Sequence, residues 1–560
     1  MASPGKEREK DIASEEVKDV DDEESGSEDD EEIDHTLPEA STPSTSNKKK
    51  KKQSKAMRAL NALRGKDNIP QELVDVVLDK VKTEHGDSLP DANEANVRAA
   101  LQQMKIRDVL QGKSGIGGKN KKDVGTHKFW STQPVPQLGE AAYEEDGYIE
   151  APKPSEEVRQ DPYPLPKEFV WSTLDLTDDA QLRELWELLS ANYVEDDDAS
   201  FRFQYSAEFL RWALQPPGYH KEWHVGVRVA SNKKLVAFVA AFPINLRVRA
   251  NLLRASEVNF LCVHKKLRSK RLAPVLIKEV TRQCHLKGVF QALYTAGALL
   301  PTPVSTCRYN HRCLNIPKLV NVRFTYVPSN MTLARMIRIN KVPEHPRLLD
   351  RGLREMEEKD LLEVAALYAK YMQRFDMRLE FTSEEVRHHF LSGRGEGPGE
   401  KESWKKPRPG QVVWTYVIEN PTTHKITDFF SFYSLPSSII GHPKHDVLNA
   451  AYLYYYATDV AFEEGAEESG RLKKRLEELI GDCLSVADQA KFDVVNGLSL
   501  MDNRYFLQDL KFGLGDGLLN FYLFNWRTAP LAGLNAVGGT DAVLLVLYKL
   551  CYVGGRSDKI

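Results

Sequence analysis

A basic loop between an apolar string and a helical stretch is the part of this sequence best suited to bind an anion. The β-type string 257–264 runs into a loop that contains Arg268, Lys270 and Arg271, and the amphipathic stretch 273–287 follows. A helix N-terminus offers backbone N–H groups and the positive end of the helix dipole. Guanidinium and ammonium groups beside it can pair with a pyrophosphate or a 3′-phosphate. The loop is therefore a candidate phosphate site, and a solvated basic turn is an equally good interpretation of it.

Strands and helices alternate on both sides of this loop, which indicates an α/β or α+β body. The expected strands lie at 223–229, 235–242, 258–263, 292–294, 412–419, 428–434, 494–496 and 521–524. The expected helices lie at 180–192, 273–287, 359–375 and 472–491. Two polar inserts, 392–411 and 463–475, are expected on the surface, and so is the pair His388-His389.

The N-terminal residues differ in composition from this body. Residues 15–34 are almost all Asp, Glu and Ser, and 48–52 are five lysines, although the net charge of the 560-residue chain is only −4. Blocks of like charge cannot bury a core, so 1–55 is expected to be disordered, and 56–124 to form short amphipathic helices and a linker. The tail is either a solubilising segment or an electrostatic arm for ribosomal RNA or an anionic membrane. A nuclear-import signal is a further interpretation of the lysines.

Composition also limits the class of protein. No apolar stretch reaches the roughly 18 residues of a membrane span, and no apolar N-terminal segment is typical of a secretory signal, so an integral membrane protein is not expected. Six scattered cysteines without a CxxC pair indicate a reducing compartment. His442 and His445 share a proline-containing turn but lack further metal ligands. The expectation is a cytoplasmic, monomeric enzyme that uses no metal and does not bind DNA.

Several other residues have plain structural interpretations when each is taken alone. Phe129 and Trp130 are typical of core aromatic residues, and 196–198 is typical of a solvated acidic turn. The run 452–456 is typical of a packed aromatic stripe, and a lone histidine such as His311 is more often structural than functional.

Longer strings change this interpretation, because in their order they resemble N-myristoyltransferases. The most specific are Glu257-Val-Asn-Phe-Leu-Cys-Val-His264, which continues through the basic loop, and Lys511-Phe-Gly-Leu-Gly-Asp-Gly517. Further strings lie at 128–136, 192–198, 294–297 and 307–312, and the resemblance extends from about Lys128 to Leu547. The loop also follows in part the Arg-x-x-Gly-x-Gly/Ala pattern of acetyltransferase-like acyl-CoA loops, with Arg271 in place of the middle glycine.

The resemblance implies a fold of two acetyltransferase-like halves related by a pseudo-twofold axis. The first half, expected at 125–340, would bind myristoyl-CoA, and the second, expected at 341–547, much of the peptide. Residues 548–560 would be an atypical extension. The implied reaction is transfer of myristoyl to the N-terminal glycine amine of nascent or cleaved proteins, by direct attack on the thioester after ordered binding of acyl-CoA and then peptide.

The resemblance also implies roles for individual residues. Phe260 and Leu261 match residues whose backbone N–H groups form an oxyanion hole, and Asn259 and Thr295 match residues that position the amine. The positions that match the acyl-CoA site are His127, Lys128, Phe129, Trp130, Asn259, Phe260, Leu261, Cys262, Val263, Ser269, Lys270, Arg271, Leu272 and Ala273. The positions that match the peptide groove are Tyr193, Asp196, Asp198, Phe201, Phe203, Tyr205, Tyr294, Tyr309, His311, Ser437, Tyr452, Asp516 and Leu519.

The end of the chain departs from the family pattern. A glycine amine has a pKa of about 8 and must lose a proton before it attacks. The family's base is the free C-terminal carboxylate, which here belongs to Ile560 and not to Leu547, the residue that resembles the family's last one. We expect a missed final splice, and a spliced transcript that still encodes 548–560 would contradict this. The alternatives are an acyl-CoA- or peptide-binding protein without activity, an acetyltransferase, and a ribosome-associated adaptor.

Overall fold

The computed structural model describes residues 129–137, 140, 145–193, 200–297, 299–397, 407–529 and 531, without the side chain of Ser269. The predictions for 1–55, 56–124 and 548–560 therefore lie outside the described residues, as do those for His127, Lys128, Asp196, Asp198 and the C-terminal carboxylate.

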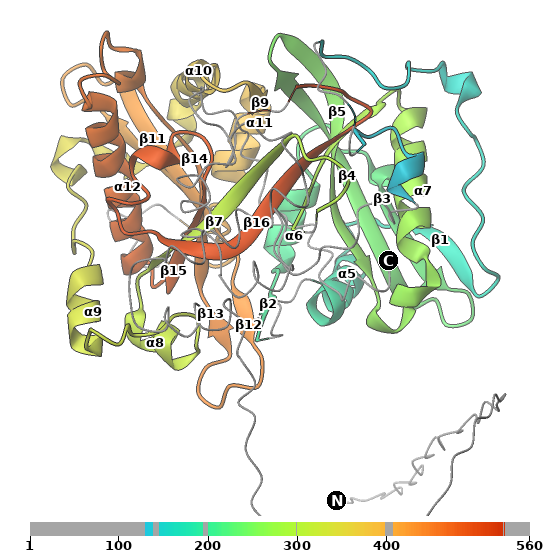
Figure 1. The fold of residues 1–560 in the computed structure, drawn as a ribbon, viewed down its shortest axis with the longest axis horizontal. Coiled ribbons are helices and arrows are strands. Elements are labelled where there is room, and N and C mark those ends of the chain that lie inside the picture. Colours follow the sequence, from blue (N-terminus) through green and yellow to red (C-terminus); the bar gives the residue numbers. More distant parts are fainter. Residues whose placement is uncertain are drawn as a thin grey trace, which may run out of the picture.

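One large mixed sheet runs through the molecule (Figure 1). The strands on one side of it are β1 (Phe169–Thr173), β3 (His224–Val229), β4 (Leu235–Val248), β5 (Asn251–Val263) and β6 (Gln291–Ala296). Those on the other side are β8 (Leu353–Glu355), β10 (Val413–Glu419), β11 (Ile426–Ser434), β14 (Ala450–Thr458) and β15 (Val494–Leu498). Between the two sets lie β16 (Gly513–Phe524) and β7 (Ser305–Cys313).

The two sets of strands repeat one topology. In the first, β1, β3, β4 and β5 are antiparallel, and β6 joins β5 in parallel after helix α7 (Leu272–Leu286). In the second, β8, β10, β11 and β14 are antiparallel, and β15 joins β14 in parallel after helix α12 (Arg471–Gln489). The halves then exchange a strand, because β16 pairs with β6 while β7 pairs with β15. This repeat is the expected pair of halves; the boundary at 340 stays a prediction.

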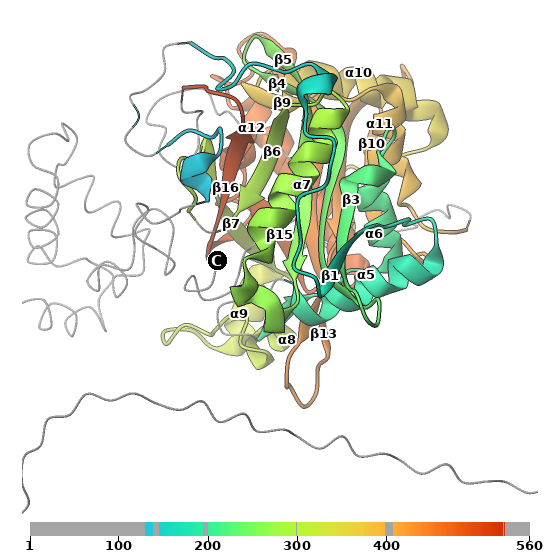
Figure 2. The same cartoon turned by 90° about the vertical axis from the view of Figure 1, so that its right-hand side faces the viewer.

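Helices cover the sheet, and three short strands of the second half pair with the first half or extend that pairing. The helices are α5 (Asp179–Asn192), α6 (Ala207–Leu214), α8 (Ile316–Asn321), α9 (Leu333–Asn340), α10 (Leu361–Met372) and α11 (Ser383–Arg387). Figure 2 shows α7 lying over β3, and it packs against β3, β4 and β5. A small sheet joins β2 (Phe201–Phe203) of the first half to β12 (Ser437–Ile439) and β13 (Val447–Leu448) of the second. Strand β9 (Met377–Leu379) pairs with β4.

The surface prediction was wrong for His389. His389 lies in a π-helical turn (His388–Ser392) and is only 4 % exposed, because its ring stacks on Phe381. The second polar insert is largely exposed, as predicted, and its last residue, Arg475, lies in α12 and pairs with the fully buried carboxylate of Asp428. None of the helices in the described part of the chain is long and apolar enough to cross a membrane.

His285, at the C-terminal end of α7, predicts a loss of stability in acid. Burial, together with the charge of Lys153, lowers the pKa of His285 to about 4, while the unfolded chain titrates near 6.5. The unfolded state therefore binds more protons between these values, and stability falls as the pH falls through them. From pH 8 to pH 5 we expect His285 to cost about 2 kcal/mol. Urea unfolding of wild type and His285→Leu at pH 8 and at pH 5 measures this loss of stability, which should be smaller in the variant. The exposed control His345→Leu should lose as much stability between the two pH values as wild type does.

Candidate active site

Strand β5 carries a β-bulge at the predicted oxyanion hole. Two residues, Phe260 and Leu261, stand opposite the single residue Val239 of β4. Phe260 has φ of +56°, a left-handed conformation that costs a bulky residue on the order of 1–2 kcal/mol. Its ring is fully buried against Tyr193 and Tyr205, which hold the bulge in place. A bulge takes backbone groups out of the regular ladder and so can direct them at a ligand.

The sheet opens beside this bulge. The parallel pairing of β5 with β6 ends at Glu257 and Leu293. Because side chains alternate along a strand, the next residues on the same faces are Asn259 and Thr295. The structure therefore brings the two predicted amine-positioning residues to facing edges of the opening, both of them buried. Leu261 and Val263 point the other way and pack against the core under α7.

The basic loop leads into the N-terminus of α7, as the order of strand, loop and helix in the sequence indicated. A short 3₁₀ helix (Lys265–Lys270) leads to Arg271, whose φ of +56° turns the chain into α7. Arg271 makes no side-chain capping bond to the first turn of α7, and Lys270 and Arg271 are exposed. Leu272 is buried under the first turn and Ala273 is partly buried. The helix N-terminus is thus flanked by two exposed cations, a suitable place for a phosphate group.

Arg268, the third cation of the predicted phosphate site, is hydrogen-bonded to backbone carbonyl groups of the protein. Its Nε donates to the carbonyl oxygen of Val263 at 3.4 Å, and its Nη2 donates to the carbonyl oxygen of Asn192 at the C-terminal end of α5. Lys265 N donates to the side chain of Asn192 at 3.0 Å. Arg268 is therefore a link between the loop and α5, and its share in binding phosphate stays a prediction.

The second half contains the equivalent loop with the opposite charge. Gly470 precedes α12 in the left-handed conformation, with φ of +73°, as Arg271 precedes α7. The loop 459–470 contains five Asp or Glu and no Lys or Arg, whereas 264–271 contains five Lys or Arg and no Asp or Glu. Only the first half can therefore attract a polyphosphate at this point of the repeat.

The segment before β1 returns to the sheet through an aromatic stack. Trp130 stacks on Tyr294 at 5.2 Å between ring centroids, Tyr294 stacks on Tyr522 at 5.1 Å, and Phe129 meets Trp130 edge to face. Tyr294 therefore lies on the face of β6 opposite to Thr295. The register places Leu519 of β16 and Tyr309 and His311 of β7 on the Thr295 face, so Tyr294 does not share a face with these predicted groove residues.

Six of the other residues predicted to line the peptide groove belong to two aromatic groups. In the first, Phe203 contacts Tyr205 at 6.1 Å and Tyr452 at 6.4 Å between ring centroids, and Tyr193 contacts Tyr205 at 5.9 Å. In the second, Phe324 meets Phe201 and His311 edge to face. Nothing in the sequence pattern indicated Phe324, whose place is set by the loop after α8.

His311 is held as a neutral ring. Its Nδ1 lies 2.7 Å from Oδ1 of Asn496, which fixes the proton on Nδ1 because a carboxamide oxygen only accepts. Burial lowers the pKa of His311, against the opposite effects of Asn496 and of the nearby carboxylate of Asp516. Asp516 is exposed on the glycine-rich start of β16. An uncharged imidazole with one free acceptor nitrogen suits a hydrogen-bond donor on a ligand.

The remaining predicted residues are structural neighbours of this site. Ser437 pairs with Phe203 across the small sheet, Leu519 is buried opposite Cys307, and Tyr309 is buried on β7. Burial raises the pKa of the Cys262 thiol to about 12, so it is a poor nucleophile. Within the described residues, no group of three or more His, Cys, Asp or Glu side chains can hold a metal ion.

Comparison with known proteins agrees with this geometry. The family model for the N-terminal domain of myristoyl-CoA:protein N-myristoyltransferase matches residues 148–307, and that for the C-terminal domain matches 321–543. Glycylpeptide N-tetradecanoyltransferase of Emericella nidulans is 50 % identical over 455 residues, 80 % of this chain and 89 % of the relative. The enzyme of that name from Mycosarcoma maydis is 46 % identical, over 83 % and 75 % of the two chains.

A solved structure is similar along most of its length. Saccharomyces cerevisiae N-myristoyltransferase with bound myristoyl-CoA superposes with a TM-score of 0.68 and is 47 % identical, over 73 % of this chain and 94 % of that one. Two family models in order and relatives near half identity leave one assignment: this chain belongs to the myristoyl-CoA:protein N-myristoyltransferase family.

Proposed function

We propose that this protein transfers the myristoyl group of myristoyl-CoA to the N-terminal glycine amine of proteins. The observation that carries the proposal is the bulge at Phe260 and Leu261, placed at the sheet opening beside the cationic loop. This arrangement occurs in the half whose loop is basic, and the family to which the chain belongs acts on this acyl-CoA.

The acyl donor is bound along the first half in this mechanism. Lys270, Arg271 and the first turn of α7 bind the phosphates of coenzyme A. The backbone N–H groups of Phe260 and Leu261 donate to the thioester oxygen, which gains charge as the amine attacks. Preorganised donors of this kind lower a barrier by about 3–4 kcal/mol each. These donors are backbone groups, so the bulge itself supplies them and no polar side chain is needed.

The acceptor amine is positioned between Asn259 and Thr295. The neutral nitrogen forms a bond to the carbonyl carbon while the carbon–sulfur bond breaks, and coenzyme A leaves as the thiolate, which takes up the proton that the new amide nitrogen loses. The proton that the ammonium group loses goes to a base, for which we propose the C-terminal carboxylate of the mature chain. Side chains after the glycine lie along the aromatic groups that contain Tyr205 and His311.

Mass spectrometry of a Gly-Xaa-Xaa-Xaa-Ser peptide tests this function after incubation with myristoyl-CoA, and acetyl-CoA serves as the control donor. The full chain and a chain that ends at Leu547 are compared. Addition of myristoyl to the peptide by either chain supports the proposal. Acyl-CoA binding without any transfer by either chain would favour a binding protein, and faster transfer from acetyl-CoA an acetyltransferase.

The close approach of β16 to His311 gives a further prediction. A Cβ on Gly515 would lie 2.5 Å from Nε2 of His311 and 2.7 Å from the carbonyl oxygen of Tyr309, so the strand or the imidazole must move. We expect Gly515→Ala to raise KM for the peptide about tenfold and to cost about 1–3 kcal/mol of stability. Gly513→Ala is the matched control, because its nearest contact is 3.7 Å away. Equal kinetics for both variants would contradict this role of Gly515.

We also propose where the enzyme acts and with what partners. We propose that the enzyme acts in the cytoplasm. A monomer is sufficient for the reaction, since one chain holds both the acyl-CoA loop and the peptide residues. The lysine run 48–52 is proposed to hold the enzyme near ribosomal RNA, where N-terminal glycines emerge. Co-sedimentation with ribosomes, with and without these lysines, tests that partner.

A further inference from the structure

The carboxamide of Asn259 is held by a second buried side chain. Nδ2 of Asn259 donates to Oε1 of Glu257 at 2.6 Å, and both residues are only 1 % exposed. A carboxylate oxygen accepts hydrogen bonds and does not donate them, so the NH₂ end of the amide must face Glu257. The other end of the amide, Oδ1, is then directed away from Glu257. The pair thus fixes which end of Asn259 is offered to a ligand.

We propose that Glu257 is a positioning residue for the transfer reaction, acting through Asn259. This inference rests on the proposed function, in which Asn259 meets the glycine amine. An amine N–H needs an acceptor, which is what Oδ1 supplies. With the amide turned by 180°, an NH₂ group would face the amine and would have no lone pair for its N–H. Glu257 therefore selects the orientation in which the amine is held by its hydrogen and its lone pair is left for the thioester carbon.

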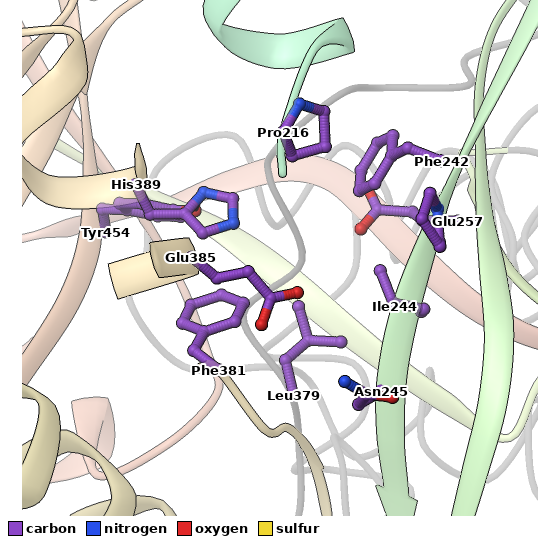
Figure 3. Close-up of a pocket in the computed structure, with 11 residues that line it drawn as sticks. Pro216, Phe242, Ile244, Asn245, Glu257, Leu379, Phe381, Glu385, His389 and Tyr454 are labelled. Atoms are coloured by element: carbon purple, nitrogen blue, oxygen red, sulfur yellow. Dashed lines mark hydrogen bonds between the residues drawn. The ribbon is translucent and has the colours of Figure 1, made fainter. Parts of the chain in front are cut away.

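The surroundings of Glu257 allow it to remain a buried acceptor. It lines a small cavity between the halves together with Glu385, His389 and Tyr454, and Figure 3 shows these side chains around the same space. The cavity has room for about one water molecule, which can solvate a buried carboxylate. His389 is hydrogen-bonded to Tyr454, whose hydroxyl lies 3.2 Å from Nδ1 of His389. In this cavity only Glu257 is hydrogen-bonded to Asn259 among the contacts of the described residues.

Glu257→Gln tests the proposal with little change in shape. A glutamine can face Asn259 with either end of its amide, so the orientation of Asn259 is no longer fixed. We expect kcat for myristoyl transfer to fall about 10- to 100-fold, the usual effect of a misplaced reactant, while the Kd for myristoyl-CoA stays within about twofold. Glu385→Gln is the matched control: it changes the other carboxylate of the cavity, does not touch Asn259, and should leave kcat unchanged.

A charge swap separates positioning from a merely structural role. In the double variant Glu257→Gln/Asn259→Asp, the new amide can donate to the new carboxylate, whose second oxygen again offers an acceptor to the amine. We expect this variant to recover at least tenfold in kcat over Glu257→Gln alone. Thermal unfolding and acyl-CoA binding of each variant show that it is folded.

The outcomes are distinct. A kcat of Glu257→Gln within about threefold of wild type, an equal loss in Glu385→Gln, or no recovery in the double variant would each overturn the positioning role. Failure of the wild-type chain itself to transfer myristoyl, in both its full and its Leu547-terminated forms, would instead overturn the proposed function.

Discussion

The double variant Lys270→Glu/Arg271→Glu should raise KM for myristoyl-CoA about 100-fold while kcat at saturation changes little. Both cations are exposed at the N-terminus of α7, and neither contributes to the core. Each charge-assisted bond to a phosphate contributes about 1.5 kcal/mol or more, and two lost bonds amount to about 3 kcal/mol, a factor of about 100. Steady-state kinetics with varied myristoyl-CoA at fixed peptide measure the effect.

Two comparisons make this prediction specific. Lys474→Glu changes an exposed lysine in the first turn of α12, the helix that corresponds to α7 in the second half, and should leave KM unaltered. The wild-type KM should also rise with ionic strength, and that of the double variant much less, because the screened attraction has been removed. An unchanged KM in the double variant would mean that the phosphates are bound elsewhere and that the loop is a solvated basic turn.

The elements around the acyl-CoA loop could be predicted because their signals are local. The expected helix 180–192 is α5, which begins after Asp178, whose side chain caps the N–H of Ala180. The expected strand 258–263 and helix 273–287 are the end of β5 and α7. The order of strand, basic loop and helix was predictable without knowledge of any distant contact, and the phosphate site at this loop stays a prediction.

Strands set by distant partners were not predictable. β7 has the sequence Ser-Thr-Cys-Arg-Tyr-Asn-His-Arg-Cys, which is too polar to indicate a central strand, yet β15 and β16 flank it. β16 begins at Gly513, eight residues before the apolar run at 521–524 that predicted it, because Gly513 and Leu514 pair with His311 and Asn310 although three of these eight residues are glycines. Both strands pair with strands of the other half, and the hydrophobic periodicity of a single segment does not indicate such distant partners.

The site residues divide in the same way. The strings that resemble the family identified Asn259 and Thr295, and the structure brings both to one opening of the sheet. The same strings contained Glu257, but nothing in its type or spacing indicated a bond to Asn259, since residues two apart on a strand share a face only once the strand is known. The bulge likewise depends on the register with β4 and not on the sequence of β5.

The two halves repeat the fold but not the charge of the loop, which supports our proposal that the first half binds the acyl donor. Both halves place a left-handed residue before the helix that follows the fourth strand. In the first half the neighbouring residues are basic and exposed. In the second they are acidic, and α12 instead directs a cation inward, from Arg475 to Asp428. In the second half, the equivalent helix α12 therefore has a structural role.

Arg475→Met should destabilise the enzyme by about 3–5 kcal/mol, the usual cost of leaving a buried charge without its partner. Nε and Nη2 of Arg475 donate to the two carboxylate oxygens of Asp428 at 2.8 and 2.5 Å, and the Asp428 side chain is 0 % exposed. Among the described residues, the hydroxyl of Thr427 is then the one side-chain donor left to this carboxylate, at 2.7 Å. Urea unfolding followed by tryptophan fluorescence measures the loss of stability.

Two further variants decide whether the unpaired charge is the cause. Arg475→Met/Asp428→Leu removes both charges and should recover most of the lost stability, because replacing a buried ion pair by apolar side chains is often neutral. Arg387→Met breaks the exposed pair with Glu358 and should cost less than about 1 kcal/mol. If the double variant were as unstable as Arg475→Met, the loss would come from packing around α12. The unpaired charge of Asp428 would then not cause the loss of stability, and the position of α12 against the sheet would depend on the fit of its side chains and not on the ion pair.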